Sequence, residues 1–393
     1  MKTFFITAFL LFVFPFTSKG QADSMPESES KPAHFHFQGY LKDLQTATFT
    51  RDKGSLFTGN FLHNRLNFIY YFSENISARL ELRTRLFWGE QVRWTPGFAE
   101  QIDYENGLMD LSWVAVDEPA VVLHTITDRL SLNWRKQSWD VTIGRQRVNW
   151  GITTAWTPND LFNAYNFFDF DYEERPGSDA IRVRYHTSGM SGFDLAISHG
   201  KDSASTIAAL LYRFNRGGYD FQILGGWFRD DLAVGTGWAG SIGNAGFKGE
   251  ATWFQPRQSL GDSTGLLSLT LGGDYSFQNG WYIGGAFLYT SGGSDGAEAL
   301  EQLATQQLSA KRLMPFRYSL LGQVAKSITP LFTANLSLIY CPGADAFITF
   351  PVLTYSLSDN WDANLVAQSF FAPAGGQFKN LGNALIFRLK WGF

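Results

Sequence analysis

The chain contains a single cysteine, Cys341, among 393 residues, which excludes a disulfide framework and a cysteine cluster for a metal. Charged residues are scarce at 17%, against roughly 25% in a typical soluble domain. Beyond the N-terminal segment, no run approaches the roughly eighteen consecutive apolar residues of a transmembrane helix. The six histidines show no metal-ligand or nucleophile-elbow spacing, so we expect no enzyme activity, no metal and no cofactor.

Aromatic residues and glycine are abundant instead. Aromatics make up 16% of the chain, and there are 39 glycines, 13 tryptophans and 36 phenylalanines. The mean hydropathy is nevertheless slightly negative, at −0.13. This combination is typical of a transmembrane β-barrel, because its apolar residues alternate with polar ones along each strand.

The N-terminal segment predicts an exported protein. Lys2 is followed by an apolar run from Phe4 to Phe16 and then by small and polar residues up to Ala22. The alternative, a membrane anchor, needs a longer run to cross roughly 30 Å of hydrocarbon. We therefore expect a signal peptide over 1–22, a disordered periplasmic lead-in over 23–32 and a barrel over 33–393 in the bacterial outer membrane.

The C-terminal segment has the alternation of a membrane strand. Arg388 and Lys390 have one parity, and large apolar residues have the other. A strand of this kind with a terminal Phe resembles the signal that the barrel assembly machinery recognises in outer-membrane proteins. The residues expected to form that signal are Phe387, Leu389, Trp391 and Phe393.

Similar alternating segments recur along the chain, and they predict an all-β fold: a transmembrane antiparallel β-barrel of about 18 strands, with 16 possible. The expected strands cover 33–43, 60–72, 76–88, 126–135, 139–149, 179–187, 192–199, 205–214, 219–229, 232–241, 245–254, 265–277, 281–290, 316–326, 331–340, 346–357, 361–371 and 381–393. Short turns rich in Gly, Asn, Asp and Ser alternate with longer connections, of which the long loops lie near 89–125, 150–178 and 291–315. An even strand number places both the N- and the C-terminus in the periplasm.

Arginines in the expected strands indicate which face is the lumen. In strand 76–88, leucines alternate with arginines. An arginine facing lipid at the bilayer midplane costs roughly 2–4 kcal/mol, so the arginine face must point inward. This parity argument gives a candidate substrate path along the lumen, formed by Arg65, Arg79, Arg83, Arg85, Arg129, Arg135, Arg145, Arg182, Arg184, Arg317 and Arg388.

Strand 139–149 does not keep one phase. If Val141 and Ile143 face lipid, the alternation would send Arg145 outward as well. A β-bulge near Gly144–Gln146 would turn at least one arginine and Asn149 into the lumen. Alternatively, the strand leaves the hydrocarbon band here and Trp150 lies at the membrane interface.

The following loop, 150–178, is expected to form a constriction. Its candidate residues are Trp150, Asp160, Asp169, Asp171, Glu173, Glu174 and Arg175. Acidic residues are concentrated in the long loops, which leaves a mainly basic interior that favours anions. The alternative is that loop carboxylates pair with the lumenal arginines and hold a plug. The run from Asp169 to Glu174 lacks the spacing of a calcium loop, so no metal is assigned to it.

Residues at the end of strand 139–149 and at the end of the long loop resemble a known family. They are Gly144, Arg145, Gln146, Trp150, Gly151, Pro158, Asp160, Arg175, Pro176, Gly177, Asp179, Ala180 and Arg182. This pattern resembles the outer-membrane porins of the alginate-export type and related uncharacterised porin-like proteins, over roughly 60 residues. The resemblance implies an eighteen-stranded barrel with an arginine-lined lumen that passes an anionic polysaccharide.

The sequence therefore predicts a porin-like channel for passive diffusion of small or polymeric anionic solutes, with acidic saccharides as one class. The alternatives are a structural or adhesive barrel with a loop-plugged lumen, or an enzyme on the barrel rim. Expected partners are outer-membrane lipid, the assembly machinery and an anionic solute. Nucleic acid is not expected, because no likely loop carries an exposed basic tract, and the oligomeric state stays open.

Overall fold

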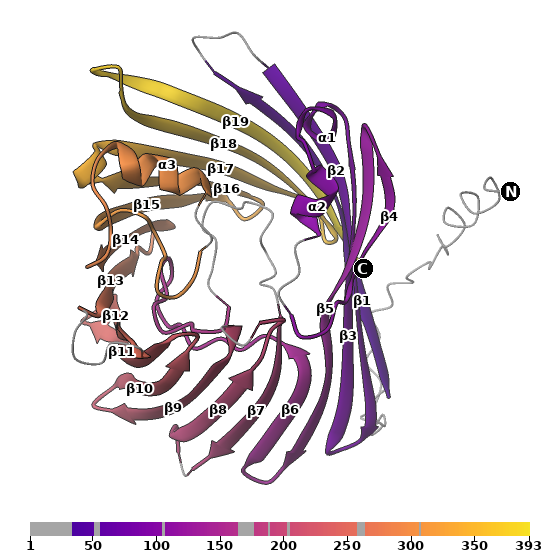
Figure 1. The fold of residues 1–393 in the computed structure, drawn as a ribbon, viewed down its shortest axis with the longest axis vertical. Coiled ribbons are helices and arrows are strands. Elements are labelled where there is room, and N and C mark those ends of the chain that lie inside the picture. The colour runs from indigo at the N-terminus through magenta and orange to yellow at the C-terminus, as the bar shows by residue number, and fades with distance from the viewer. Residues whose placement is uncertain are drawn as a thin grey trace, which may run out of the picture. The chain divides into compact units, whose positions relative to one another are not determined.

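A computed structural model describes residues 34–50, 56–103, 107–163, 177–187, 189–202, 205–257, 264–305 and 308–393. Within this part of the chain, nineteen strands form one antiparallel sheet that closes where β1 pairs with β19 (Figure 1). The expected signal peptide and lead-in, residues 1–32, lie outside the described residues.

The strands are β1 Phe35–Phe49, β2 Leu56–Ser73, β3 Ile76–Trp88, β4 Ser112–Glu118, β5 Val121–Lys136, β6 Trp139–Gln146, β7 Ser178–His186, β8 Gly192–Ser198, β9 Ile207–Arg216, β10 Tyr219–Phe228, β11 Asp231–Ile242, β12 Ala245–Pro256, β13 Leu266–Ser276, β14 Trp281–Thr290, β15 Tyr318–Thr329, β16 Phe332–Cys341, β17 Ala346–Ser358, β18 Trp361–Ala374 and β19 Gln377–Gly392. The helices are α1 Glu90–Trp94, α2 Phe98–Ile102, α3 Ala297–Thr305 and the 3-10 turn η4 Pro342–Ala344. In the described part, no helix is both long and apolar enough to cross a membrane.

The eighteen-strand barrel is confirmed. β4 pairs with the first residues of β5, whereas β3 pairs directly with β5, so the ring consists of the nineteen described strands without β4. Each of the eighteen expected strands corresponds to a strand of this ring. The main difference lies in 89–125, expected as one loop, where the structure has α1, α2, β4 and the start of β5 at Val121.

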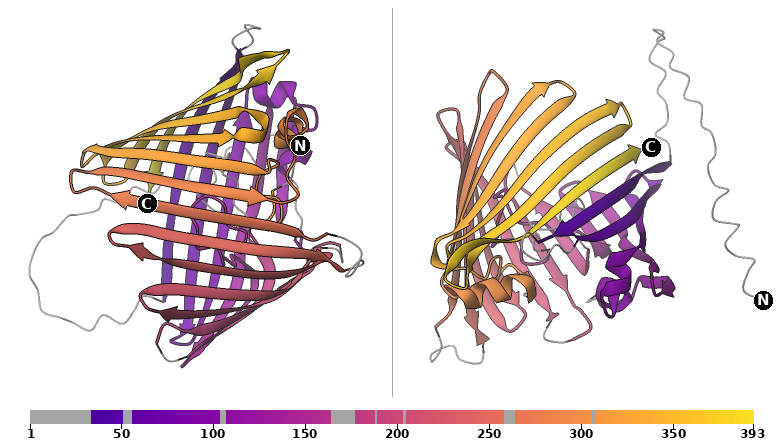
Figure 2. Two further views of the ribbon diagram at one scale, coloured as in Figure 1. Left: turned by 90° about the vertical axis from the view of Figure 1, so that its left-hand side faces the viewer. Right: turned by 90° about the horizontal axis from the view of Figure 1, so that it is seen from above.

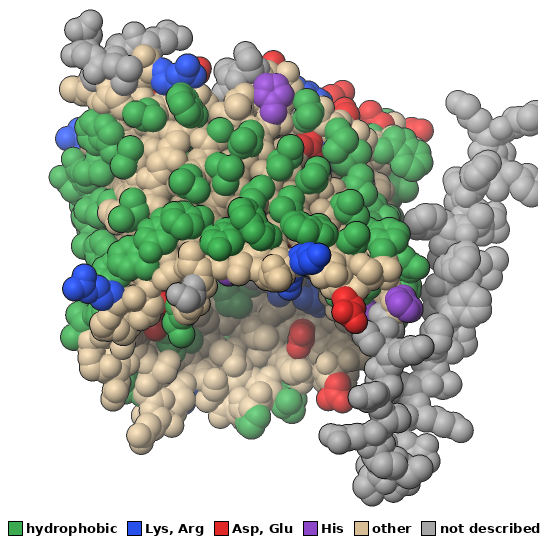
Figure 3. Space-filling model, turned by 90° about the horizontal axis from the view of Figure 1, so that it is seen from below, with side chains coloured by type: hydrophobic (Ala, Val, Ile, Leu, Met, Phe, Trp, Pro, Cys, Tyr) green, Lys and Arg blue, Asp and Glu red, His purple; other side chains and the backbone are tan. Residues whose placement is uncertain are grey.

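Alternation along the strands separates two faces of the wall. In β8, Phe193, Leu195 and Ile197 are exposed, whereas Asp194 and Ala196 are buried. Large exposed apolar side chains recur in this way on most strands, and Figure 3 shows them spread over a broad field on one face of the molecule. An apolar outer band of this kind is what a barrel presents to lipid.

The connections are short at one end of the barrel and longer at the other, as Figure 2 illustrates. At the short-turn end, β9 and β10 are joined by Gly217 and Gly218, with φ of 63° and 81°. Such positive φ values suit a two-residue hairpin and cost glycine little. Because barrels of this type have short periplasmic turns, the short-turn end is the periplasmic one.

Candidate functional site

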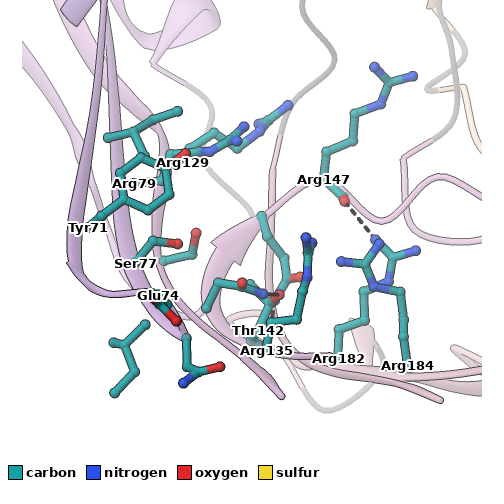
Figure 4. A pocket seen from close by; sticks show the side chains of 16 residues that line it. Tyr71, Glu74, Ser77, Arg79, Arg129, Arg135, Thr142, Arg147, Arg182 and Arg184 are labelled. Carbon is teal, nitrogen blue, oxygen red and sulfur yellow. Dashed lines mark hydrogen bonds between the residues drawn. The ribbon is translucent and has the colours of Figure 1, made fainter. Parts of the chain in front are cut away.

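A polar cavity of about 340 Å³ lies on the inner side of β3, β5, β6 and β7, near the periplasmic end. Six arginines line it: Arg79, Arg129, Arg135, Arg147, Arg182 and Arg184. Its other polar lining residues include Glu74, Asn133, Thr142 and Gln146. Figure 4 shows arginine side chains that enter the cavity from both of its sides.

Strand alternation brings these arginines together. On β7, Arg182 and Arg184 alternate with the exposed Ile181 and the half-buried Val183. On β5, a register shift relative to β3 leaves Asp128 as an extra residue between Thr127 and Arg129. Asp128 and Arg129 are therefore adjacent in sequence and both buried, while the next residue, Leu130, is exposed.

Buried carboxylates in the wall hold the cavity arginines. The Asp140 carboxylate accepts hydrogen bonds from Arg135 Nη2 and Arg184 Nη2, each at 2.8 Å. The side chain of Asp140 is 2% exposed, whereas those of Arg135 and Arg184 are 68% and 30% exposed. Arg79 repeats this arrangement, being 52% exposed while its partner Glu81 is 12% exposed. A solute in the cavity therefore meets the guanidinium side of each pair.

Asp194 on β8 has a similar role for Arg182. Its carboxylate accepts from Arg182 Nε at 2.9 Å and from Nη2 at 2.5 Å. Its Oδ2 atom also accepts from the Trp150 indole N–H at 3.0 Å. Arg182 Nη1 in turn donates to the carbonyl of Arg147 at 3.3 Å, so the start of the long loop contacts the cavity wall (Figure 4).

The remaining arginines of the expected lumen path lie outside the cavity lining. Arg65 is fully buried between Glu81 and Asp128, and Arg83 donates to Asp128 at 2.8 Å. Arg85 lies 3.2 Å from His124 Nδ1. Arg317 Nε is 3.6 Å from Asp295 Oδ2, and Arg388 Nη2 donates to Asn364 Oδ1 at 2.8 Å.

Arg145 differs from the position that the sequence suggested. Arg145 pairs with Leu130 and Asp179, and no register shift interrupts the pairing of β6 with β5 or β7. Arg145 therefore lies on the same face of the wall as the exposed Ile143. It is 2% exposed because Nε binds Asp179 at 2.8 Å and Nη2 donates to the Met109 carbonyl at 2.6 Å. The Met109 N–H donates back to Asp179 at 3.0 Å. Arg145 and Asp179 thus form a buried ion pair at the edge of the wall. The backbone beside it is distorted at Gly144, which has a positive φ of 110°.

Residues 147–163, called here the lumen segment, leave the wall after β6 and pack against its inner side. Trp150 and Phe162 share a buried apolar cluster with Leu211 of β9 and Leu224 of β10. Trp156 belongs to a second cluster, with Met314 and residues of β14 to β18. Asp160 is fully buried, and its Oδ1 accepts from the Trp150 N–H at 3.4 Å. The other candidate constriction residues, Asp169, Asp171, Glu173, Glu174 and Arg175, lie outside the described residues.

The C-terminal residues singled out in the sequence complete the ring. Phe387, Leu389 and Trp391 lie on β19 between β1 and β18. The last residue, Phe393, exchanges backbone hydrogen bonds with Gly39 of β1, at 2.8 and 2.9 Å.

Sequence reasoning missed the carboxylates inside the wall and one residue on the opposite wall, Glu250. It looked for acidic residues in the loops, whereas Asp128, Asp140 and Asp194 are strand residues. The available signal was alternation within each strand, because Asp140 has the parity opposite to the exposed Ile143, and Asp194 lies between the exposed Phe193 and Leu195. No group of three potential metal ligands occurs in the described residues.

No family model matches the chain, and no curated protein matches it. Solved structures of the same fold do exist. Acinetobacter baumannii OccAB4 has a TM-score of 0.59 and 8% identity, over 92% of this chain and 98% of that one. Pseudomonas aeruginosa OccK8 (OprE) has a TM-score of 0.57 and 11% identity, over 91% of this chain and 98% of that one. For Pseudomonas aeruginosa OpdK, solved with vanillate, the values are 0.56 and 9%, over 91% and 98%. The resemblance to the alginate-export type stays a prediction, and the chain has the fold of the eighteen-stranded porin barrels of the bacterial outer membrane.

Proposed function

We propose that this protein is a passive outer-membrane channel whose lumen prefers anions. The observation that carries the proposal is the contrast in exposure within the ion pairs of the cavity, where Arg135 is 68% exposed and Asp140 is 2% exposed. In these pairs the carboxylate is buried within the barrel wall, and the guanidinium group faces the solute in the cavity. Guanidinium groups placed in this way replace part of the hydration of a carboxylate or phosphate.

The solute class within this proposal is an organic anion, small or polymeric. Acidic saccharides belong to it through the resemblance to alginate-export porins. The same fold in OpdK was solved with vanillate, an aromatic carboxylate, so small carboxylates belong in the same tests. Arginine suits both, because its planar fork binds a carboxylate through two parallel hydrogen bonds.

The test is single-channel recording of the refolded full-length barrel under a salt gradient. A stable conductance with an anion-selective reversal potential supports the proposal, and vanillate and oligouronates are then added as blockers. A cation-selective or unselective conductance refutes the anion preference.

A second candidate, a structural barrel with a plugged lumen, is favoured by the apolar packing of the lumen segment. Trp150 and Trp156 seal it against the walls on two sides of the interior. In that case a barrel shown to be folded by its heat-modifiability on gels would have no conductance.

A further inference from the structure

Glu250 on β12 is a fully buried acidic residue whose hydrogen bonds all come from the lumen segment. Its Oε1 accepts from the N–H groups of Ile152 and Thr153, at 2.5 and 2.7 Å, and from the Thr153 hydroxyl at 2.9 Å. Its Oε2 accepts from the Asn159 N–H at 2.9 Å. One side chain thus binds both ends of the stretch 152–159.

The wall beside Glu250 is shaped to receive this stretch. Asn159 Nδ2 donates to the Thr236 carbonyl at 3.0 Å, and the Thr252 hydroxyl donates to Asn159 Oδ1 at 2.6 Å. Glycines on β11 leave the necessary room. A Cβ at Gly235 would stand 2.7 Å from Asn159 Oδ1, and one at Gly237 would stand 3.0 Å from Asn159 Nδ2.

The barrel itself has no need of a carboxylate at this position. The neighbouring inward residues of β12, Thr252 and Phe254, are neutral and equally buried. Burying a carboxylate is costly unless several donors converge on it. Here the donors come from the loop, so the carboxylate is explained by what it holds.

We propose that Glu250 is a positioning residue that holds the lumen segment against β10–β12 and so keeps the arginine-lined cavity on β3–β7 open. The inference rests on the proposed channel function and assigns a residue that sets its aperture. When Glu250 is replaced, residues 152–159 lose the four hydrogen bonds that it accepts, while the side-chain bonds of Asn159 to Thr236 and Thr252 are kept. The stretch around residues 152–153 is then free to enter the lumen, where it closes the channel intermittently.

The hydrogen bonds of Trp150 connect this movement to the charge of the cavity. The Trp150 indole donates to Asp194 Oδ2, the oxygen that also accepts from Arg182 Nη2. A shift of the lumen segment removes one donor from Asp194 and changes the field at Arg182. Release of the segment is therefore expected to alter ion selectivity as well as conductance.

The test compares Glu250→Ala and Glu250→Gln with Thr270→Ala in the refolded full-length chain. Thr270 is a matched control, because it faces Glu250 in the register of β12 and β13, is 1% exposed, and donates to Phe287 of the wall rather than to the loop. Two readouts are used: single-channel recording, and hydrogen–deuterium exchange of peptides covering 150–160. Heat-modifiability on gels establishes that each variant is folded.

Glu250→Ala removes four hydrogen bonds, and the loss of one charge-assisted bond alone corresponds to about a tenfold change, so we expect closures at least about tenfold more frequent. We also expect faster exchange of the amides of residues 152, 153 and 159, and a changed reversal potential. Glu250→Gln keeps the three hydrogen bonds to Oε1 and loses the one from the Asn159 N–H, so faster exchange should be confined to Asn159. If Glu250→Ala does not fold, the result for Glu250→Gln decides the test of the inference.

Unchanged exchange in a folded Glu250 variant, or faster exchange with unaltered conductance and closure, would overturn the inference. If the wild-type barrel does not conduct, the proposed function fails instead, and the aperture role falls with it. Exchange then still decides whether Glu250 holds the segment.

Discussion

Removing the two exposed arginines, Arg79 and Arg135, tests the basic cavity most directly. Both line the cavity, and their side chains are 52% and 68% exposed. Neither change leaves a buried carboxylate without a partner, because Arg65 still binds Glu81, and Arg184 and Asn133 still bind Asp140. Arg83 and Arg182 are poorer choices, since Arg83 does not line the cavity and Arg182 donates two hydrogen bonds to the buried carboxylate of Asp194.

The magnitude follows from direct contact between an anion and a guanidinium group. The cavity of about 340 Å³ has room for a small anion against its lining, where the anion lies about 4 Å from the charge of one arginine. At that distance, two unit charges interact by about 1 kcal/mol in a medium as polar as water. One arginine thus changes the occupancy of an anion about fivefold, and the double variant changes it by up to about 25-fold.

The assay is the reversal potential under a salt gradient, measured for Arg79→Ala, Arg135→Ala and the double variant. Lys136→Ala is the control, because this exposed cation follows Arg135 directly and does not line the cavity. The anion-to-cation permeability ratio should fall by about fivefold per arginine at about 0.1 M salt, and by less at about 1 M, where the Debye length is about 3 Å. A folded double variant with the wild-type ratio, or an equal effect of Lys136→Ala, would refute the reasoning.

Three further predictions concern stability and assembly. Arg65→Ala leaves Glu81 and Asp128 without their fully buried partner, and should lower the free energy of unfolding by about 3–5 kcal/mol in urea titrations; a loss below about 1 kcal/mol would contradict this. Gly39→Val should reduce the folded fraction on gels, because an added Cβ would clash with the Arg65 carbonyl oxygen and stand 2.8 Å from the Phe393 ring. At Gly392 an added Cβ meets nothing within 4 Å, so Gly392→Ala should assemble normally. The backbone N–H and then the hydroxyl of Thr58 lower the pKa of Glu90 from its usual 4.5, so the anchoring of α1 is present above that value and lost as pH falls below it. Exchange of residues 89–103 should therefore rise in acid, and a flat pH profile would exclude this anchor.

The architecture could be predicted because two local rules repeat in every strand. Apolar side chains alternate with polar ones, and the short turns contain the residues that tight hairpins require. The exceptions lie where the chain departs from these rules. β4 extends the wall beside the first residues of β5, and a sequence of seven residues between two loops gives little sign of such an extra strand.

The cavity could be predicted only in part, and the reason is electrostatic. Parity alone identified Arg79, Arg129, Arg135, Arg182 and Arg184 as inward residues, and all five line the cavity. Parity could not show which arginines would be enclosed by carboxylates of neighbouring strands, as Arg65 and Arg145 are. Those contacts depend on register and on the course of the loops, neither of which is local in sequence.

Arg145 shows how a family-like motif can have a structural rather than a transport role. The chain leaves the wall just after Arg145 and returns just before Asp179, and both residues bind the backbone of Met109. The residues on either side of the connection between β6 and β7, which includes the lumen segment, are thus both bound to the chain at Met109. Glu250 then holds the middle of that segment on the opposite wall. The charges of Arg145 and Asp179 are therefore explained by fixing where the chain leaves the wall and where it returns. The charges that a solute would meet are instead those of Arg79, Arg135 and Arg184, which the wall carboxylates leave facing the cavity.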